Sequence, residues 1–260
     1  MKKILFSFAL LALASTTVFA ADSPWAGTWK LDLSKSHFTG DTFTYSKTST
    51  GMMHYSDGST TSFDFGTDGK PYPTAQGRTT TWTADGDHTW TSIAKYNDTV
   101  LSTTHRTLSA DGKTLTIVSS GKRPDGSDFK EESTYVRVTG TSGLAGKWRN
   151  VKYDQTAADF YILSFPSPAI IKWDIPSQKE TVTGKMDGSD LPISGPNVPK
   201  NLTLSLKLVS PTKLTYTVRD GGKPLAYGSD TLSADGKTLT DVSWSPGKES
   251  EKQTGIYIKQ

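Results

Sequence analysis

The sequence predicts an all-β protein made of two tandem antiparallel up-and-down β-barrels with little helix. Residues 108–116 return letter for letter 124 positions later as residues 232–240, which indicates an internal duplication. Apolar and polar residues alternate over short segments, as they do in strands with one buried face. Asp-Gly pairs recur at hairpin intervals, which is typical of a strand meander.

The N-terminal 20 residues are predicted to be a secretory signal peptide. Lys2 and Lys3 precede an apolar run over residues 4–14, and small residues near Ala20 form a cleavage site. The run is shorter than the roughly 20 residues that a membrane-spanning helix needs. No Cys follows Ala20 to carry a lipid anchor. We therefore expect an exported protein, periplasmic or secreted, without an integral membrane span.

The composition favours a packed β protein and gives no support to nucleic-acid binding. Without Lys2 and Lys3, 27 basic residues face 26 acidic ones, so no excess of positive charge exists to attract a phosphate backbone. The chain has no Cys, so its stability has to come from hydrophobic cores and not from disulfides.

Further matches extend the duplication to units of about 115 to 120 residues. Residues 25–30 match 144–149, and residues 68–73 match 187–192, both 119 positions later. The closing Tyr-Val-Arg at 135–137 matches Tyr-Ile-Lys at 257–259. These anchors predict a first barrel over 21–139, a second barrel over 144–260, and a short flexible linker between them.

Within each unit the strands follow one another in sequence. Leucines alternate with polar residues over 202–208, and the alternation resumes over 214–218 after a turn. Short strands joined by tight turns pair antiparallel, and a barrel leaves no exposed edges. A sandwich is the alternative. Around Pro166 and Pro168 the second unit departs from the first, and proline argues against a central strand there.

The Gly-x-Trp segments at Gly27-Thr28-Trp29 and Gly146-Lys147-Trp148 resemble the first strand of lipocalins and their calycin relatives. The run 27–36, Asp-Gly-Lys-x-Tyr-Pro at 68–73, the repeated turn and the closing Tyr-Val-Arg resemble bacterial exported lipocalin-like domains of unknown substrate. The resemblance covers nearly all of the first unit but only the anchors of the second.

The resemblance implies that each Gly-x-Trp indole closes one barrel end beneath a basic side chain from the last strand. Applied within each unit, the resemblance pairs Trp29 with Arg137 and Trp148 with Lys259. Gly27 and Gly146 of the same motif are also expected to be barrel-closing residues. A lysine is expected to stack less well than an arginine, because its ammonium is a hydrated point charge.

Aromatic side chains on the predicted strands either fill the barrels or line a ligand cavity. The candidate ligand-binding residues are Tyr45, Phe63, Phe65, Trp82, Trp90, Tyr216, Tyr227 and Trp244.

No pattern in the sequence indicates catalysis, a metal or a cofactor. The four histidines lie in the first unit without the spacing of metal ligands. Adjacent Glu131 and Glu132 point to opposite faces of a strand and so do not form an acid/base pair. We therefore expect a protein that is not an enzyme.

These observations favour a carrier that binds a small hydrophobic or amphipathic molecule inside a barrel. We expect a monomer with two interacting domains and no nucleic-acid partner. The alternative is a structural or interaction protein of the cell envelope with packed, ligand-free barrels. A cavity open to solvent would favour the carrier.

Overall fold

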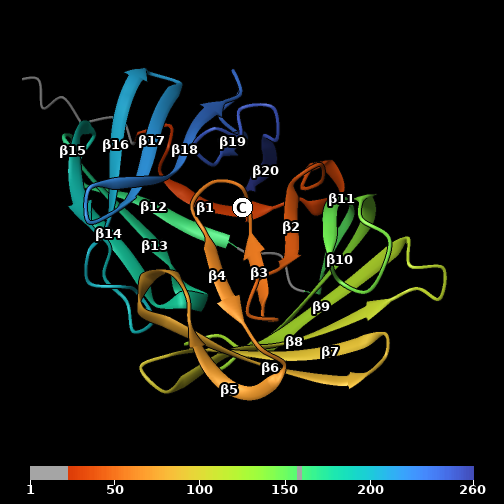
Figure 1. The fold of residues 1–260 in the computed structure, drawn as a ribbon. Helices are drawn as coiled ribbons and strands as arrows, with labels where there is room; N and C mark the ends of the chain where they lie inside the picture. The colour runs from red at the N-terminus through yellow and green to blue at the C-terminus, as the bar shows by residue number, and fades with distance from the viewer. Residues whose placement is uncertain (1–22, 157–159) are drawn as a thin grey trace, which may run out of the picture.

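A computed structural model describes residues 23–156 and 160–260 of the chain, and the predicted signal peptide lies outside these residues. The described chain is almost entirely β-strand. It forms two antiparallel ten-stranded sheets, each curled into a nearly closed barrel, which confirms the predicted fold class (Figure 1). None of the described residues belongs to a helix long and apolar enough to cross a membrane.

One sheet, here called barrel 1, has the strand order β4-β3-β2-β11-β10-β9-β8-β7-β6-β5. Its strands are β2 (Thr42–Lys47), β3 (Met53–Ser56), β4 (Ser62–Phe65), β5 (Asp68–Pro73), β6 (Arg78–Gly86), β7 (Thr89–Tyr96), β8 (Thr99–Leu108), β9 (Thr114–Lys122), β10 (Asp128–Thr139) and β11 (Gly146–Gln155).

The other sheet, barrel 2, has the order β14-β13-β12-β1-β20-β19-β18-β17-β16-β15. Its strands are β1 (Gly27–Leu31), β12 (Phe160–Ser167), β13 (Ile170–Ile175), β14 (Glu180–Lys185), β15 (Asp187–Pro192), β16 (Leu202–Ser210), β17 (Lys213–Asp220), β18 (Lys223–Leu232), β19 (Thr238–Trp244) and β20 (Gln253–Lys259). The described chain also contains three single turns of 3-10 helix, at Leu33–Lys35, Ala75–Gly77 and Pro176–Gln178.

The two repeats exchange their first strands, which corrects the predicted domain boundaries. β1 of the first repeat lies between β12 and β20 of barrel 2, and β11 of the second repeat lies between β10 and β2 of barrel 1. Figure 1 shows the red β1 among the teal and blue strands of the other repeat. Neither 21–139 nor 144–260 therefore forms a barrel from its own strands alone.

The short connection between the repeats explains this exchange. β10 and β11 pair as a hairpin in which Thr139 lies opposite Lys147. Closing such a short loop costs much less chain entropy than pairing β10 with β1, which lies about 100 residues away in sequence. Once β11 occupies the place beside β10, β1 is left to fill the equivalent gap beside β20.

The exchange also changes which cation covers which indole. Arg137 lies 4.2 Å above the ring of Trp148, and the Lys259 ammonium lies 5.4 Å from the ring of Trp29. The sequence-based pairing of Trp29 with Arg137 and of Trp148 with Lys259 was wrong, because each cation covers the indole directly opposite it in the ladder. The longer lysine distance agrees with the expected weaker stack.

Both indoles are fully buried and are held in the same way. Trp29 and Trp148 each have 0% exposure. Their ring N–H groups donate to the carbonyls of Trp25 and Leu144, four residues earlier, at 2.9 Å in both cases. At Gly146, with φ of 145°, a Cβ atom would lie 2.2 Å from the Thr139 carbonyl oxygen and 2.9 Å from the Arg137 guanidinium, so the strand pairing here requires glycine.

β12 contains Pro166 and is nevertheless a central strand between β1 and β13, which corrects the expectation drawn from its prolines. The ladder with β1 ends at Leu163, and the ladder with β13 shifts register between Ser164 and Ser167. Pro166 thus occupies a bulge in which no ladder hydrogen bond is lost.

The two barrels differ in how their edge strands meet. In barrel 2, Thr181 on β14 exchanges two backbone hydrogen bonds of 2.9 Å with Ser194, just after β15. In barrel 1, β4 and β5 are in contact, and no ladder between them is part of the described sheet. The seam of barrel 1 is therefore the looser one.

Candidate functional site

The candidate site is a cavity of about 540 Å³ that opens at the mouth of barrel 1. Polar and charged side chains line part of its wall, and barrel 1 adds six aromatic side chains, Phe43, Tyr45, Tyr55, Phe63, Trp82 and Tyr135. They come from β2, β3, β4, β6 and β10, so the cavity belongs to the barrel interior and not to a single loop. Its volume lies within the range of about 300–1,000 Å³ that is usual for small-molecule sites.

These aromatic rings contact one another and form a continuous apolar surface. The ring centroids of Phe43 and Tyr135 are 4.8 Å apart, and those of Tyr55 and Phe63 are 5.2 Å apart. Burial, with the charge of Asp41 as a second cause, raises the pKa of Tyr135 to about 12. Burial likewise raises the pKa of Tyr55, so both phenols stay neutral at physiological pH.

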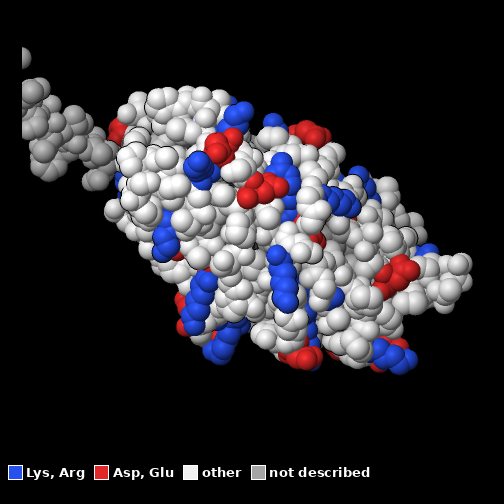
Figure 2. Space-filling view, turned by 90° about the vertical axis from the view of Figure 1, so that its left-hand side faces the viewer, with Lys and Arg blue, Asp and Glu red and all other residues white. Residues whose placement is uncertain are grey.

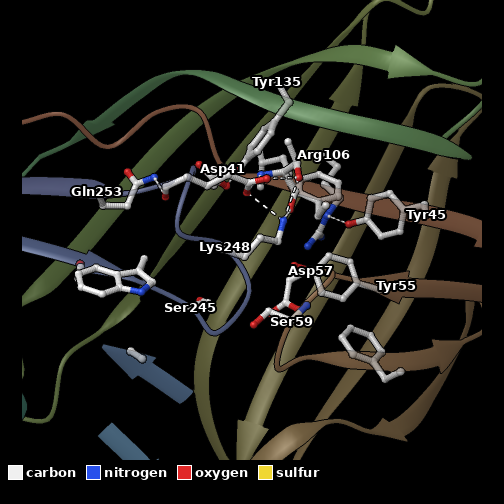
Figure 3. Close-up of a pocket in the computed structure, with 18 of the residues that line it drawn as sticks. Asp41, Tyr45, Tyr55, Asp57, Ser59, Arg106, Tyr135, Ser245, Lys248 and Gln253 are labelled. Atoms are coloured by element: carbon white, nitrogen blue, oxygen red, sulfur yellow. Dashed lines mark hydrogen bonds and ion pairs between the residues drawn. The ribbon is translucent and has the colours of Figure 1, made fainter. Parts of the chain in front are cut away.

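A loop of barrel 2 completes the rim of this cavity. Lys248 and Glu251 form an ion pair of 2.9 Å, and both bind Thr42 at the start of β2. Ser59, in the turn between β3 and β4, donates to the carbonyl of Pro246 at 2.6 Å. Figure 3 shows Lys248 and Ser245 reaching over the cavity from the blue loop opposite Tyr45 and Tyr55. Both repeats therefore contribute to the site.

Arg106 on β8 brings a positive charge into the wall of this cavity, beside its aromatic side chains. Its Nε donates to the Tyr45 hydroxyl at 3.2 Å (Figure 3). Its Nη1 donates to the Ser92 hydroxyl at 2.8 Å. Its guanidinium carbon lies 3.9 Å above the ring of Trp82. Among the described residues, no carboxylate forms an ion pair with Arg106.

A smaller pocket of about 230 Å³ lies on the other side of Arg106 and Trp82. Threonine and serine residues line much of it, including Thr80, Ser92 and Thr104. Residues at the ends of β4 and β5 also border it, at the loose seam of barrel 1. The interior of barrel 1 thus changes from aromatic to hydroxyl-lined across Arg106.

Small residues at two positions of the repeat explain why barrel 1 is hollow there. Ser92 and Thr104 lie opposite each other on β7 and β8. Their counterparts 124 positions later are Tyr216 and Gly228, which lie opposite each other on β17 and β18. The Tyr216 ring occupies the space over Gly228 so closely that a Cβ atom there would lie 2.1 Å from it. In barrel 2 a tyrosine therefore fills the equivalent volume.

Barrel 2 carries a pair of acids where barrel 1 carries Arg106 and Ile117. Asp230 and Asp241 lie directly opposite each other on β18 and β19, and the Tyr216 hydroxyl donates to Asp241 at 2.7 Å. Asp230 is only 2% exposed. Burial, followed by the charge of Asp241, raises the pKa of Asp230 well above its usual value. Asp230 therefore holds a proton more strongly than a free carboxyl does.

Replacing Asp230 by asparagine is expected to stabilise barrel 2 at neutral pH. A carboxyl whose pKa is raised by folding binds more protons when folded, so its contribution to stability falls as the pH rises above the unfolded value of about 3.8. The introduced amide would donate to Asp241 without that proton. We expect D230N to raise Tm at pH 7 by at least about 2–4 °C, equivalent to about 1 kcal/mol, and to gain less at pH 4. An unchanged Tm difference between the two pH values would contradict this assignment.

The structure brings four of the eight predicted ligand-binding residues to the cavity and places four elsewhere. Tyr45, Phe63, Trp82 and Trp244 line it. Phe65 is fully buried and stacks on Trp82 with ring centroids 4.1 Å apart. The remaining three lie elsewhere: Trp90 packs against the core of barrel 1, Tyr216 lies inside barrel 2, and Tyr227 pairs with Trp244 across β18 and β19.

Arg106 is absent from the predicted site residues, although a pattern in the sequence points to it. Arg106 stands two positions before Leu108, the inward leucine of the repeated hairpin, so both share one strand face. Asp230 stands in the same relation to Leu232. A charged residue at an inward position of both copies was therefore detectable. Lys248 and Glu251 carry no comparable pattern.

The described residues hold no cluster of metal-ligating side chains, and Figure 2 shows how charge is distributed on one face of the protein. Within residues 23–156 and 160–260, no three histidine, aspartate or glutamate side chains converge as metal ligands. His54 instead pairs with Asp64 at 2.6 Å. On the face drawn in Figure 2, basic and acidic side chains are interspersed and do not gather into one basic patch.

The chain matches no family model, no curated protein and no solved structure.

Proposed function

We propose that this protein is an exported, lipocalin-like carrier that holds a small hydrophobic or amphipathic molecule in the interior of barrel 1. The observation that carries the proposal is the cavity of about 540 Å³, whose lining includes seven aromatic side chains. Apolar burial against such a wall stabilises a ligand by about 25 cal/mol per Å². Among the polar side chains of the lining, Tyr45 supplies a hydroxyl and Arg106 a charge that orient a ligand.

The two barrels have different roles in this proposal. Barrel 2 is filled at the position where barrel 1 is hollow, and its loop with Lys248 and Glu251 shapes the rim of the cavity. Barrel 2 therefore acts as a scaffold and as part of the entrance. The signal-like N-terminus and the Gly-x-Trp strands support export and a lipocalin-like mode of binding.

The alternative function, an interaction protein with packed barrels, is supported by one observation at the far end of barrel 2. Leu208 and Val209 are 40% and 57% exposed beside a shallow groove that also includes Trp25 and Phe165. Exposed apolar patches often mark contact surfaces. This alternative requires that barrel 1 binds no small molecule, so one binding experiment distinguishes the two.

Filling the cavity is expected to abolish binding of the neutral fluorescent probe N-phenyl-1-naphthylamine. Ile117 lines the cavity directly opposite Arg106 on β9, so I117W places an indole in the space that a ligand would use. We expect the wild-type protein to bind the probe and I117W to bind it at least tenfold more weakly, which corresponds to about 1.4 kcal/mol. Fluorescence titration measures both affinities.

The matched control is V118W, which adds the same side chain one position along β9. Successive strand residues point to opposite faces, so Val118 lies outside the barrel. V118W should bind the probe as the wild type does. Equal affinity of all three proteins, or no binding by the wild type, would count against the cavity as a ligand site and favour the interaction protein.

A further inference from the structure

Barrel 1 contains a cation whose partners in the described structure are uncharged. The hydrogen bonds of Arg106 go to the hydroxyls of Tyr45 and Ser92, and its flat face lies against Trp82. A guanidinium has five N–H donors in a planar fork that matches a carboxylate or sulfonate. Arg106 is partly exposed to the cavity, and an anionic ligand group would complete its hydrogen bonding and balance its charge.

The acidic residues around the cavity are already engaged elsewhere. Glu251 pairs with Lys248 and Thr42 at the rim. The Asp57 carboxylate accepts backbone N–H bonds from Ser59 and Thr61 within its own turn. Burial raises the pKa of Asp41, which lies near the Tyr135 hydroxyl. None of the three forms an ion pair with Arg106 in the described structure.

The duplication provides a second, independent observation. The residue equivalent to Arg106 in barrel 2 is Asp230, and the residue opposite it changes from Ile117 to Asp241. In barrel 2 the charged position is closed over by Tyr216, whereas in barrel 1 the cation lines the open cavity. In barrel 2 the charged residue at this position, Asp230, is buried and faces a second acid. In barrel 1 the equivalent Arg106 lines the cavity and forms no ion pair in the described structure.

We propose that the ligand of barrel 1 is an amphipathic anion, with its carboxylate or sulfonate group on Arg106 and its apolar part in the aromatic chamber. This inference rests on the proposed carrier function and specifies the chemical class of its ligand. The acidic group of the ligand lies at Arg106, between the aromatic side chains of the 540 Å³ cavity and the smaller pocket lined by Ser92 and Thr104. The apolar part points toward the rim, among Phe43, Tyr55 and Phe63.

Two probes with one ring skeleton test the anionic group separately from the cavity. 1-Anilinonaphthalene-8-sulfonate carries a sulfonate, and N-phenyl-1-naphthylamine is the same skeleton without it. We expect R106Q to weaken binding of the sulfonate at least tenfold while the affinity for the neutral probe changes less than twofold. Breaking a desolvated charge pair typically costs at least this much.

Two further variants control for net charge and for folding. R149Q removes a positive charge from an exposed residue of the same barrel and should leave both affinities unchanged. R106K keeps the charge without the fork and should retain part of the preference for the sulfonate. Thermal unfolding shows whether R106Q folds. If R106Q does not fold, the same two affinities are measured on R106K, which preserves the cation.

The outcomes separate the two proposals. Equal weakening of both probes by R106Q would show that Arg106 acts through its packing on Trp82, and unchanged binding of both would show that it does not contact the ligand. Either result overturns the anionic ligand and leaves the carrier intact. Failure of both probes to bind the wild-type protein would remove the carrier function itself.

Discussion

Cysteines introduced at Lys30 and Ile258 are expected to form an intrachain disulfide in most molecules of the oxidised protein. Lys30 on β1 lies directly opposite Ile258 on β20. Antiparallel partners have Cα atoms about 4.5–5.5 Å apart, within the range that a disulfide spans. The natural chain has no Cys, so no competing thiol interferes. Mass spectrometry of the non-reduced monomer after proteolysis identifies the bridge.

The pair Lys30→Cys with Val136→Cys is the matched control. If each repeat closed on its own first strand, Lys30 would take the place of Arg149, which lies opposite Val136 on β10. K30C with V136C is therefore expected to stay reduced, and R149C with V136C to cross-link. Oxidation of the K30C and V136C pair in the monomer would contradict the strand exchange.

The duplicated pattern was sufficient to predict two barrels but not which strands each contains. β1 and β11 carry the same Gly-x-Trp motif 119 positions apart, and either one fits beside β10 or β20. The residue pattern of these strands is the same whether or not the repeats exchange their first strands. The choice depends on loop closure between β10 and β11, a property of chain connectivity and not of residue type.

The candidate site was predictable only where it follows the alternation of a strand. Tyr45, Phe63 and Trp82 reach the cavity because they share the inward face of their strands. Arg106 follows the same rule from Leu108. The rim residues Lys248 and Glu251 do not, because they reach barrel 1 from a loop of barrel 2, and their position depends on how the barrels dock.

The smaller, hydroxyl-lined pocket of barrel 1 is a difference between copies and not a property of the fold. Ser92 and Tyr216 occupy equivalent positions, and so do Thr104 and Gly228. Exchanging a serine for a tyrosine there converts a cavity wall into a filled core. The pocket beside Arg106 therefore depends on the side chains at these two positions and not on the barrel architecture, which both copies share.

Truncation of Trp29 is expected to destabilise barrel 2, although Trp29 belongs to the first repeat. The indole is fully buried among residues of barrel 2, including Leu239 and Ile171. W29A should lower the free energy of unfolding of barrel 2 by about 3–5 kcal/mol, as large aromatic truncations in cores do. For amides that exchange only when barrel 2 unfolds, this loss of stability speeds hydrogen exchange in β16–β20 by about a hundredfold or more.

W148A is the mirror experiment and Trp244→Ala is the control. Trp148 is equally buried but belongs to the core of barrel 1, so W148A should accelerate exchange in β6–β10 and spare β16–β20. Trp244 lies at the rim, outside both cores, and its truncation should affect global stability far less. Loss of protection in β6–β10 on truncation of Trp29 would mean that the first repeat closes on its own indole. Each barrel would then depend on its own repeat, and the exchanged ladders of β1 and β11 would not describe the protein in solution.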